Sequence, residues 1–488
     1  MMRFGGLDGH IARIKSVRRG AVLHVPAYRL FAVITVLFGG VFVFLVPPLW
    51  GLDEISHFNR VYHITEGKIT PQKGDKDHYG GFIPTHLAEL DKHVYTDLTN
   101  NSGKPASGRA DVDSVREYGR LLAADFNAEQ ERSIATAEYS PVAYAGALIG
   151  AFAAKIIDGN IGVYIYLSRI ASLLFYVAVG MLSLYLLRNF KVKWLFFTIL
   201  LFPVCVFQAA VISADSTAMA LAVLLMAAFF RLATNDKKTK RQTGVLFGVM
   251  AAAAILLPLT KSNYALLSFA TLLAPLVAFG TLHIRIIIKL FVVAAAAVMA
   301  FVWSRIASVT SASPYTQRQD GVLIVPGDQI AFLLDNPLRL VTATLKSVVN
   351  DSDSYLQSMA TSLGWNSVPV SYVVGVLLVV ALCVAVSYVK PDLARLKRRL
   401  LLLNCIVGIA AFGVFAALYI GFTPTGHGTV DGIQGRYFLP LLIPILMLVA
   451  AYVPVKKIEF TQPVGVICVI LAGLALCISI IYCGLVYY

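Results

Sequence analysis

Residues 28–60 read YRLFAVITVLFGGVFVFLVPPLWGLDEISHFNR, and they combine a membrane-length apolar run with two adjacent acids. The almost uncharged run of about twenty residues ends at Val46, which is long enough to cross the hydrocarbon core of a bilayer. Asp53 and Glu54 follow within a few residues. A carboxyl group at a membrane surface loses hydration and holds its proton more tightly than in water. Such an acid suits a general base or a cation ligand, while the alternative interpretation is the start of a solvated loop.

The composition predicts a polytopic membrane protein. Of the 488 residues, 58% are hydrophobic and 14% are charged, and the mean hydropathy is +0.74. Soluble domains carry about 25% charged residues. The net charge of +14 is typical of nucleic-acid binding, but here the basic clusters lie beside apolar runs. We therefore interpret them as positive-inside anchors of membrane helices and expect no nucleic-acid partner.

Eleven apolar runs have the length of a membrane helix, which predicts an all-α fold. They lie near residues 28–47, 162–187, 194–212, 214–233, 243–260, 262–281, 284–304, 370–389, 399–421, 437–454 and 463–486. With this count the basic clusters fall on one side of the membrane, so we expect a basic cytoplasmic N-terminus over residues 1–27 and an outer C-terminus. Residues 28–488 then form a single integral membrane domain.

Three outer loops are predicted, near residues 48–138, 305–369 and 422–436. The first carries much of the acid in the chain and is long enough to form short helices packed on the membrane face. The apolar stretch 139–157 is too short for a membrane span, so we expect an interfacial or re-entrant helix there. The six cysteines all lie in apolar segments and predict neither disulfides nor a zinc site.

Several polar residues sit at the predicted outer ends of the spans, where they are candidates for function. Lys261 and Arg436 are the most informative, because their charges break the positive-inside pattern. A guanidinium forms paired bonds to phosphate oxygens and an ammonium adds a point charge, so together they suit a phosphate site. We group with them Gln434, Tyr437 and Tyr264 as phosphate-binding candidates, and Arg60, Asp215 and Gln208 as supporting residues.

Three of these residues also have a purely structural interpretation. Asp215 is placed to cap the helix of residues 214–233, since Ser216 and Thr217 follow it. Lys261 is placed to extend toward lipid headgroups. Arg436 has Asp431 and Asp53 as candidate ion-pair partners.

His57 raises the question of a metal. It stands four residues after Asp53 and three after Glu54, so the three share one face if this stretch is helical. They would then share a divalent cation such as Mg²⁺ or Mn²⁺, or His57 would only orient an acid.

A set of short motifs resembles the bacterial multi-spanning proteins grouped as domain of unknown function 2142. The motifs occur in the expected order along nearly the whole chain: Asp53-Glu54-x-x-His57 with Arg60 and Glu66-Gly67, Gly80-Gly81-Phe82-Ile83-Pro84, Ser140-Pro141-Val142-Ala143-Tyr144, Ser213-Ala214-Asp215-Ser216, Lys261-Ser262-Asn263-Tyr264, Gly364-Trp365 and Gln434-Gly435-Arg436-Tyr437-Phe438-Leu439-Pro440.

That family looks like a branch of the GT-C glycosyltransferases, and the resemblance implies a GT-C-like fold in the bacterial inner membrane. It implies an inverting transfer, on the outer face, from a polyprenyl-phosphate sugar to a cell-envelope glycan or lipid-linked acceptor. Asp53 would act as the base with Glu54 beside it, and Lys261 and Arg436 would hold the donor phosphate. We expect no large C-terminal soluble domain, so the first two outer loops would recognise the acceptor. The alternatives are a lipid-linked glycan transporter or flippase, and a non-catalytic subunit of an envelope-polymer assembly complex.

Overall fold

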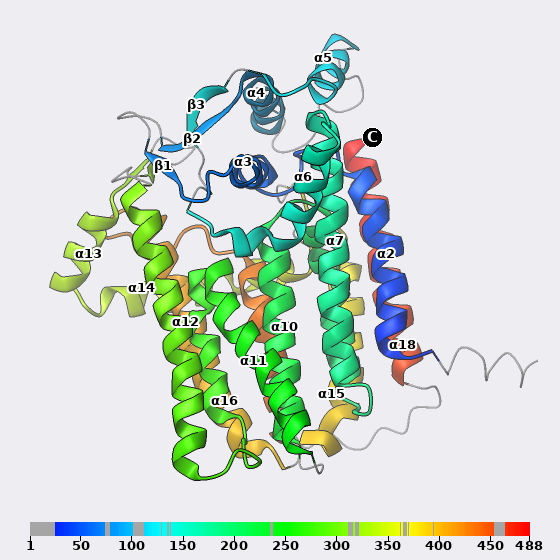
Figure 1. Ribbon diagram of the computed structural model, residues 1–488, viewed down its shortest axis with the longest axis vertical. Coiled ribbons are helices and arrows are strands. Elements are labelled where there is room, and N and C mark those ends of the chain that lie inside the picture. The colour runs from blue at the N-terminus through cyan, green and yellow to red at the C-terminus, as the bar shows by residue number, and fades with distance from the viewer. Residues whose placement is uncertain are drawn as a thin grey trace, which may run out of the picture.

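A computed structural model of the chain shows a bundle of long helices with a layer of short helices and strands at one end (Figure 1). It describes residues 25–73, 79–100, 112–127, 129–133, 136, 138–234, 238–310, 316–317, 322–361, 363–364, 368, 370–393, 395–452 and 464–488. The basic residues expected to anchor the N-terminus and those at 456–457 lie outside this range.

Nine helices in the described part of the chain are long and apolar enough to cross a membrane. They are α2 (Ala27–Leu45), α7 (Ile161–Leu186), α10 (Ala214–Ala233), α11 (Lys240–Thr260), α12 (Leu282–Thr310), α15 (Tyr372–Leu393), α16 (Lys397–Gly421), η4 with α17 (Gly435–Phe438 and Leu439–Tyr452) and α18 (Val464–Tyr487). Their composition and length confirm a polytopic helical membrane protein.

The predicted span 194–212 is a broken one. It consists of α8 (Lys193–Leu200) and α9 (Pro203–Ala210), which meet at an angle of 57° and would make a tenth span if counted together. The break follows from Pro203, which is favoured at the first position of a helix and disfavours helical backbone at the residue before it.

The prediction of a spanning α-helix over residues 262–281 was wrong. Residues Ser262–Leu273 form the 3₁₀-helix η3 instead. Pro275 has no N–H to donate, and Gly280 adopts a φ of +78°, so both residues disfavour an α-helix that extends to residue 281. η3 packs against α11, α12 and α16.

Burial divides the bundle into a centre and a periphery. The apolar window of α10 is 94% buried, whereas that of α12 is only 11% buried. Figure 1 places the start of α2 and the C-terminus at opposite ends of the bundle, with the C-terminus near the layer of short helices. The placement of the N-terminus in the cytoplasm and of that layer on the outer side both stay predictions.

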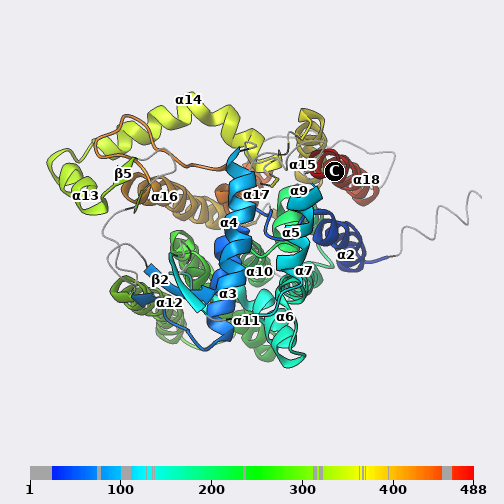
Figure 2. The same ribbon diagram turned by 90° about the horizontal axis from the view of Figure 1, so that it is seen from above.

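The end layer contains the short helices predicted for the first loop. They are α3 (Glu54–Thr65), α4 (Thr85–Asn100) and α5 (Val112–Leu122). An antiparallel sheet that was not predicted joins them: β1 (Gln72–Lys73) pairs with β2 (Tyr79–Pro84), and β2 pairs with β3 (Glu129–Ser133), with Gly80 opposite Ser133. Viewed from above, α4 crosses over the bundle (Figure 2). The second loop contributes β4 (Thr316–Gln317), β5 (Leu323–Ile324), α13 (Pro326–Asp335) and α14 (Arg339–Thr361).

The apolar stretch near residue 140 forms a short helix, as expected. It begins with the 3₁₀ turn η2 (Pro141–Tyr144) and continues as α6 (Ala145–Ile156), which packs along α7. Gly146 and Gly150 make the contact, because a Cβ at Gly150 would lie 2.0 Å from the carbonyl oxygen of Leu167. This close approach fixes the segment that leads into the site described below.

Candidate functional site

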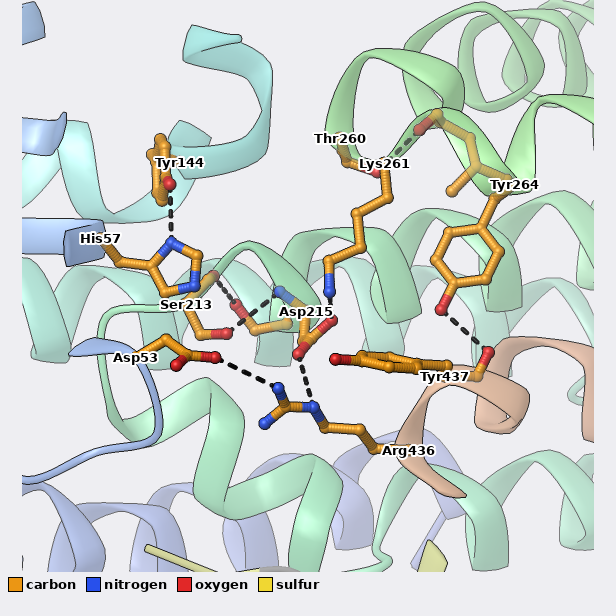
Figure 3. Close-up of polar contacts among 12 residues, drawn as sticks. Asp53, His57, Tyr144, Ser213, Asp215, Thr260, Lys261, Tyr264, Arg436 and Tyr437 are labelled. Atoms are coloured by element: carbon orange, nitrogen blue, oxygen red, sulfur yellow. Dashed lines mark hydrogen bonds and ion pairs between the residues drawn. The ribbon is translucent and has the colours of Figure 1, made fainter. Parts of the chain in front are cut away.

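Four charged side chains from four separate segments meet at the end of the bundle that carries the short helices (Figure 3). Asp53 precedes α3, Asp215 lies in the first turn of α10, Lys261 follows α11, and Arg436 lies in η4. Arg436 contacts both acids: its Nη2 lies 3.3 Å from Asp53 Oδ2 and its Nε lies 3.3 Å from Asp215 Oδ2. Lys261 Nζ forms an ion pair with Asp215. We call these four residues the ion cluster.

Asp215 is the centre of the ion cluster. The cap of α10 is Ser213, whose hydroxyl accepts a bond from the backbone N–H of Asp215, so the carboxylate of Asp215 is left to bind the two cations. The interpretation of Asp215 as a cap is therefore wrong. Its side chain is 16% exposed and that of Lys261 is 10% exposed, so the ammonium of Lys261 does not extend to lipid headgroups. Burial lowers the pKa of Lys261, but the carboxylate of Asp215 more than offsets this and raises the pKa above its ordinary value.

Tyr437 lies between the two cations. Its ring centroid is 5.1 Å from Lys261 Nζ and 5.3 Å from Arg436 Cζ, within the range of a cation–π contact. Tyr264, which is fully buried, donates its hydroxyl to the carbonyl oxygen of Tyr437 over 3.0 Å. These two tyrosines therefore hold the cationic groups in place.

Asp53 is the accessible acid of the ion cluster. Its side chain is 47% exposed, whereas Asp215 is largely enclosed. Its backbone is left-handed, with φ 58° and ψ 12°, and its side chain does not cap α3. Such a conformation costs an L-residue free energy and is found where surrounding contacts impose it, often at functional sites. Asp53 is thus held by Arg436 and accessible from outside the protein.

His57 lies next to the ion cluster and is neutral. Its Nδ1 is 2.7 Å from the hydroxyl of Tyr144, and the rings of Tyr139 and Tyr144 lie within 6 Å of the imidazole. Burial lowers the pKa of His57 to about 4, although the charge of Asp53 acts in the opposite direction. Burial also raises the pKa of Tyr144, so its hydroxyl keeps its proton. His57 therefore adds a polar but uncharged side chain to the site.

Glu54 lies outside the ion cluster. Its carboxylate is completely buried and binds Arg169 of α7 through two bonds, of 2.7 and 2.6 Å. It also accepts the backbone N–H groups of Gly51 (2.9 Å) and Ile212 (3.0 Å). Arg169 in turn donates to the carbonyl oxygens of Val43, Val46 and Pro47. The pair joins the end of α2, the start of α3, α7 and the turn before α10, so its geometry supports the site without reaching it.

The remaining predicted residues have separate positions. Arg60 is buried and donates to the carbonyl oxygens of residues 68, 69 and 139, so it shapes the loop. Gln208 is 3% exposed and lines a cavity of about 20 Å³ with Asp215 and Arg436. Neither amide atom of Gln208 has a hydrogen-bond partner among the described residues. Gln434 directly precedes η4, and its buried Oε1 likewise has no such partner.

The three candidate metal ligands do not converge. Glu54 is directed to Arg169, His57 Nδ1 to Tyr144, and Asp53 to Arg436. Over the described ranges, no group of three or more His, Cys, Asp or Glu side chains is arranged to hold a metal ion. The geometry therefore does not support a metal site shared by Asp53, Glu54 and His57.

A larger cavity adjoins the ion cluster through Lys261. It has a volume of about 740 Å³ and is lined by residues 138–140, by the end of α11 and by α12. The lining includes Glu138, Ser140, Lys261, Trp303 and Ala307.

Comparison with known families gives one match, to a model described as a predicted membrane protein, DUF2142, over residues 36–447. The chain belongs to the DUF2142 family. No match was found among curated proteins or among solved structures. The matched range contains Asp53, Asp215, Lys261 and Arg436, so the whole ion cluster lies within the DUF2142 region.

Arg169, Tyr139 and Tyr144 were not predicted as site residues. Arg169 had a clear signal, because it is the one charged residue in the apolar run 162–187, and charges in membrane segments are costly. Its partner could not be deduced, since Glu54 lies 115 positions away. Tyr144 belongs to the motif Ser140-Pro141-Val142-Ala143-Tyr144, which was the available signal for it, whereas Tyr139 gave no signal besides its place in an apolar stretch.

Proposed function

We propose that this DUF2142 protein is a membrane glycosyltransferase that moves a sugar from a polyprenyl-phosphate donor to a cell-envelope glycan or lipid-linked acceptor. The observation that carries the proposal is the ion cluster. Lys261 and Arg436 share Asp215, so these three residues have one net positive charge, which matches the single negative charge of a phosphodiester. Asp53 stands beside them as an exposed acid.

The reaction divides between Asp53 and the cations. Asp53 accepts the proton of the acceptor hydroxyl as its oxygen forms a bond to the anomeric carbon of the donor. The bond between that carbon and the phosphate oxygen breaks from the opposite side, which inverts the configuration. Its electron pair stays on the polyprenyl phosphate, whose charge Lys261 and Arg436 stabilise. Positioning is the larger task, since the phosphate is already a good leaving group.

The distribution of charge supports an enzyme over a transporter. In the described spanning helices the charged residues lie toward the helix ends, and the deepest of them, Arg169, is already paired with Glu54. A transporter is expected to place polar groups near the middle of the membrane. The proposal also includes the predicted setting: the bacterial inner membrane, with the N-terminus in the cytoplasm and the ion cluster and C-terminus on the outer face.

A transfer assay in membranes tests this proposal. Wild-type protein is supplied with radiolabelled polyprenyl-phosphate sugars, and product is measured as a function of donor concentration. We expect Arg436→Ala to raise the donor KM more than the acceptor KM, by about tenfold or more for the loss of a charge-assisted contact. The control is Arg188→Ala, which removes an exposed arginine just after the C-terminal end of α7. This variant should leave both constants unchanged. If wild type and Arg436→Ala have the same donor KM, Arg436 does not bind the donor phosphate.

A further inference from the structure

The 740 Å³ cavity beside Lys261 is a built feature of the fold. Residues 138–140 are fixed to both of its helical walls. Ser140 donates its hydroxyl to the carbonyl oxygen of Leu259 at the end of α11 (2.6 Å). The indole of Trp303 in α12 donates to the carbonyl oxygen of Glu138 (2.8 Å). The space is therefore an open cavity bordered by two helices and by a segment fastened to each of them.

The lining of this cavity suits a sugar next to a phosphate. Lys261 lines the cavity and also belongs to the ion cluster, so a phosphate at the boundary meets its ammonium. The carboxyl group of Glu138 and the hydroxyls of Ser262 and Ser304 are hydrogen-bonding partners for sugar hydroxyls. Trp303 adds an amphipathic surface for the less polar face of a sugar ring.

The same cavity borders the surface that faces lipid. α12 has the smallest buried share among the spanning helices of the described chain. Val298, Phe301 and Val302 are 57%, 66% and 46% exposed, and they alternate along α12 with the cavity-lining Ala300, Trp303 and Ser304. A long apolar chain attached to a head group in the cavity thus has an apolar surface to follow.

We propose that the cavity between α11 and α12 holds the glycosyl-phosphate head of the lipid donor. The phosphate binds Lys261, the sugar lies against Trp303 with its hydroxyls at Glu138 and Ser304, and the prenyl chain runs along the exposed face of α12. This inference rests on the proposed function and adds the place of the donor and the side from which it enters.

Photo-crosslinking of the purified full-length protein tests the location. The probe is geranylgeranyl phosphate with a diazirine in its last isoprene unit, and labelled peptides are identified by mass spectrometry. We expect labelling in α12 near residues 298–308. Ser304→Trp, which fills the cavity, should reduce labelling by about tenfold, as a loss of about 1.4 kcal/mol in binding free energy would.

Leu174→Trp is the matched control, since it adds the same side chain at a 52% exposed position of α7 that does not line the cavity, and it should leave labelling of the cavity peptides unchanged. Ser308→Trp fills the same cavity from the next turn and replaces Ser304→Trp if that variant does not fold. Labelling confined to other helices, or equal labelling of both tryptophan variants, would overturn the proposal.

Competition identifies the ligand. Unlabelled undecaprenyl phosphate should compete with the probe, whereas phosphatidylglycerol and inorganic phosphate should not. Equal competition by phosphatidylglycerol would indicate a general lipid groove, and equal competition by inorganic phosphate a free-anion site, and either result would overturn the proposal. Labelling of the cavity in a protein that transfers no sugar would refute the transferase alone, while sugar transfer with labelling elsewhere would refute only the donor location.

Discussion

Replacing Arg169 by methionine is predicted to destabilise the protein by about 3–5 kcal/mol, the cost of leaving one member of a buried ion pair without its partner. Both side chains are completely buried, so water cannot take the place of the guanidinium. The substitution would leave the carboxylate of Glu54 with only two backbone N–H donors and would remove the donor from three carbonyl oxygens at the end of α2.

The same contacts also predict how much the free energy of unfolding falls when Glu54 is replaced by glutamine. Each carboxylate oxygen accepts two N–H groups, one from Arg169 and one from the backbone of Gly51 or Ile212. An amide has one oxygen, so two donors lose their acceptor whichever way the amide turns. At about 1–3 kcal/mol for each buried unsatisfied group, the free energy of unfolding should fall by about 2–6 kcal/mol.

Denaturant unfolding of the purified protein in detergent measures both values. A double-mutant cycle adds Glu54→Leu, alone and together with Arg169→Met. The double variant should be more stable than the sum of the single changes predicts, because it leaves no buried charge unpaired. Additive changes would refute the pairing. Glu54→Gln that unfolds like the wild type yet transfers no sugar would show that Glu54 is catalytic and that its structural role is wrong.

Two further predictions concern the surroundings of the ion cluster. Between about pH 6.5 and the lowered pKa of about 4, the unfolded chain binds a proton on His57 that the folded site excludes. Stability contributed by neutral His57 is therefore complete near pH 7 and falls by up to about 3 kcal/mol as the pH decreases through this window. The melting temperature of the wild-type protein should fall more steeply between about pH 7 and pH 5 than that of His57→Gln. Parallel decreases would contradict a buried, neutral His57. Gly150→Ala should destabilise by about 1–3 kcal/mol, because the new Cβ meets the backbone of α7, whereas Gly248→Ala, with open space in α11, should be neutral or stabilising by up to about 1 kcal/mol. Similar melting temperatures for the two variants would show that α6 does not pack closely on α7.

The sequence predicted most spanning helices because each is a long apolar run, and length and hydropathy decide which segments cross a bilayer. It failed at residues 262–281, since hydropathy cannot tell an α-helix from a 3₁₀-helix. Pro275 and Gly280 in that run were the available signals. Pro203 was a similar signal for the break between α8 and α9.

The site was harder to predict than the spans. Charge at the predicted outer ends of the spans was enough to select Asp53, Asp215, Lys261 and Arg436, because polar groups there are costly. Their pairings depend on how segments up to 383 positions apart pack, which no local pattern encodes. The same limit explains why Glu54 was grouped with its neighbour Asp53. Adjacent residues at the start of a helix point in different directions, and only the position of Arg169 decides which one is buried.

The most direct test of the central claim is sugar transfer by Asp53→Asn compared with Asp158→Asn, using radiolabelled polyprenyl-phosphate sugars and purified protein. Asp158 is a fitting control, because it shares the left-handed backbone of Asp53, with φ 53°, but forms no ion pair with Lys261 or Arg436 in the part of the chain that the structure describes. We predict that Asp53→Asn loses about 10²–10⁴-fold in rate with an unchanged melting temperature, as expected for the loss of a general base, and that Asp158→Asn transfers normally. Transfer by Asp53→Asn at the wild-type rate would contradict the account.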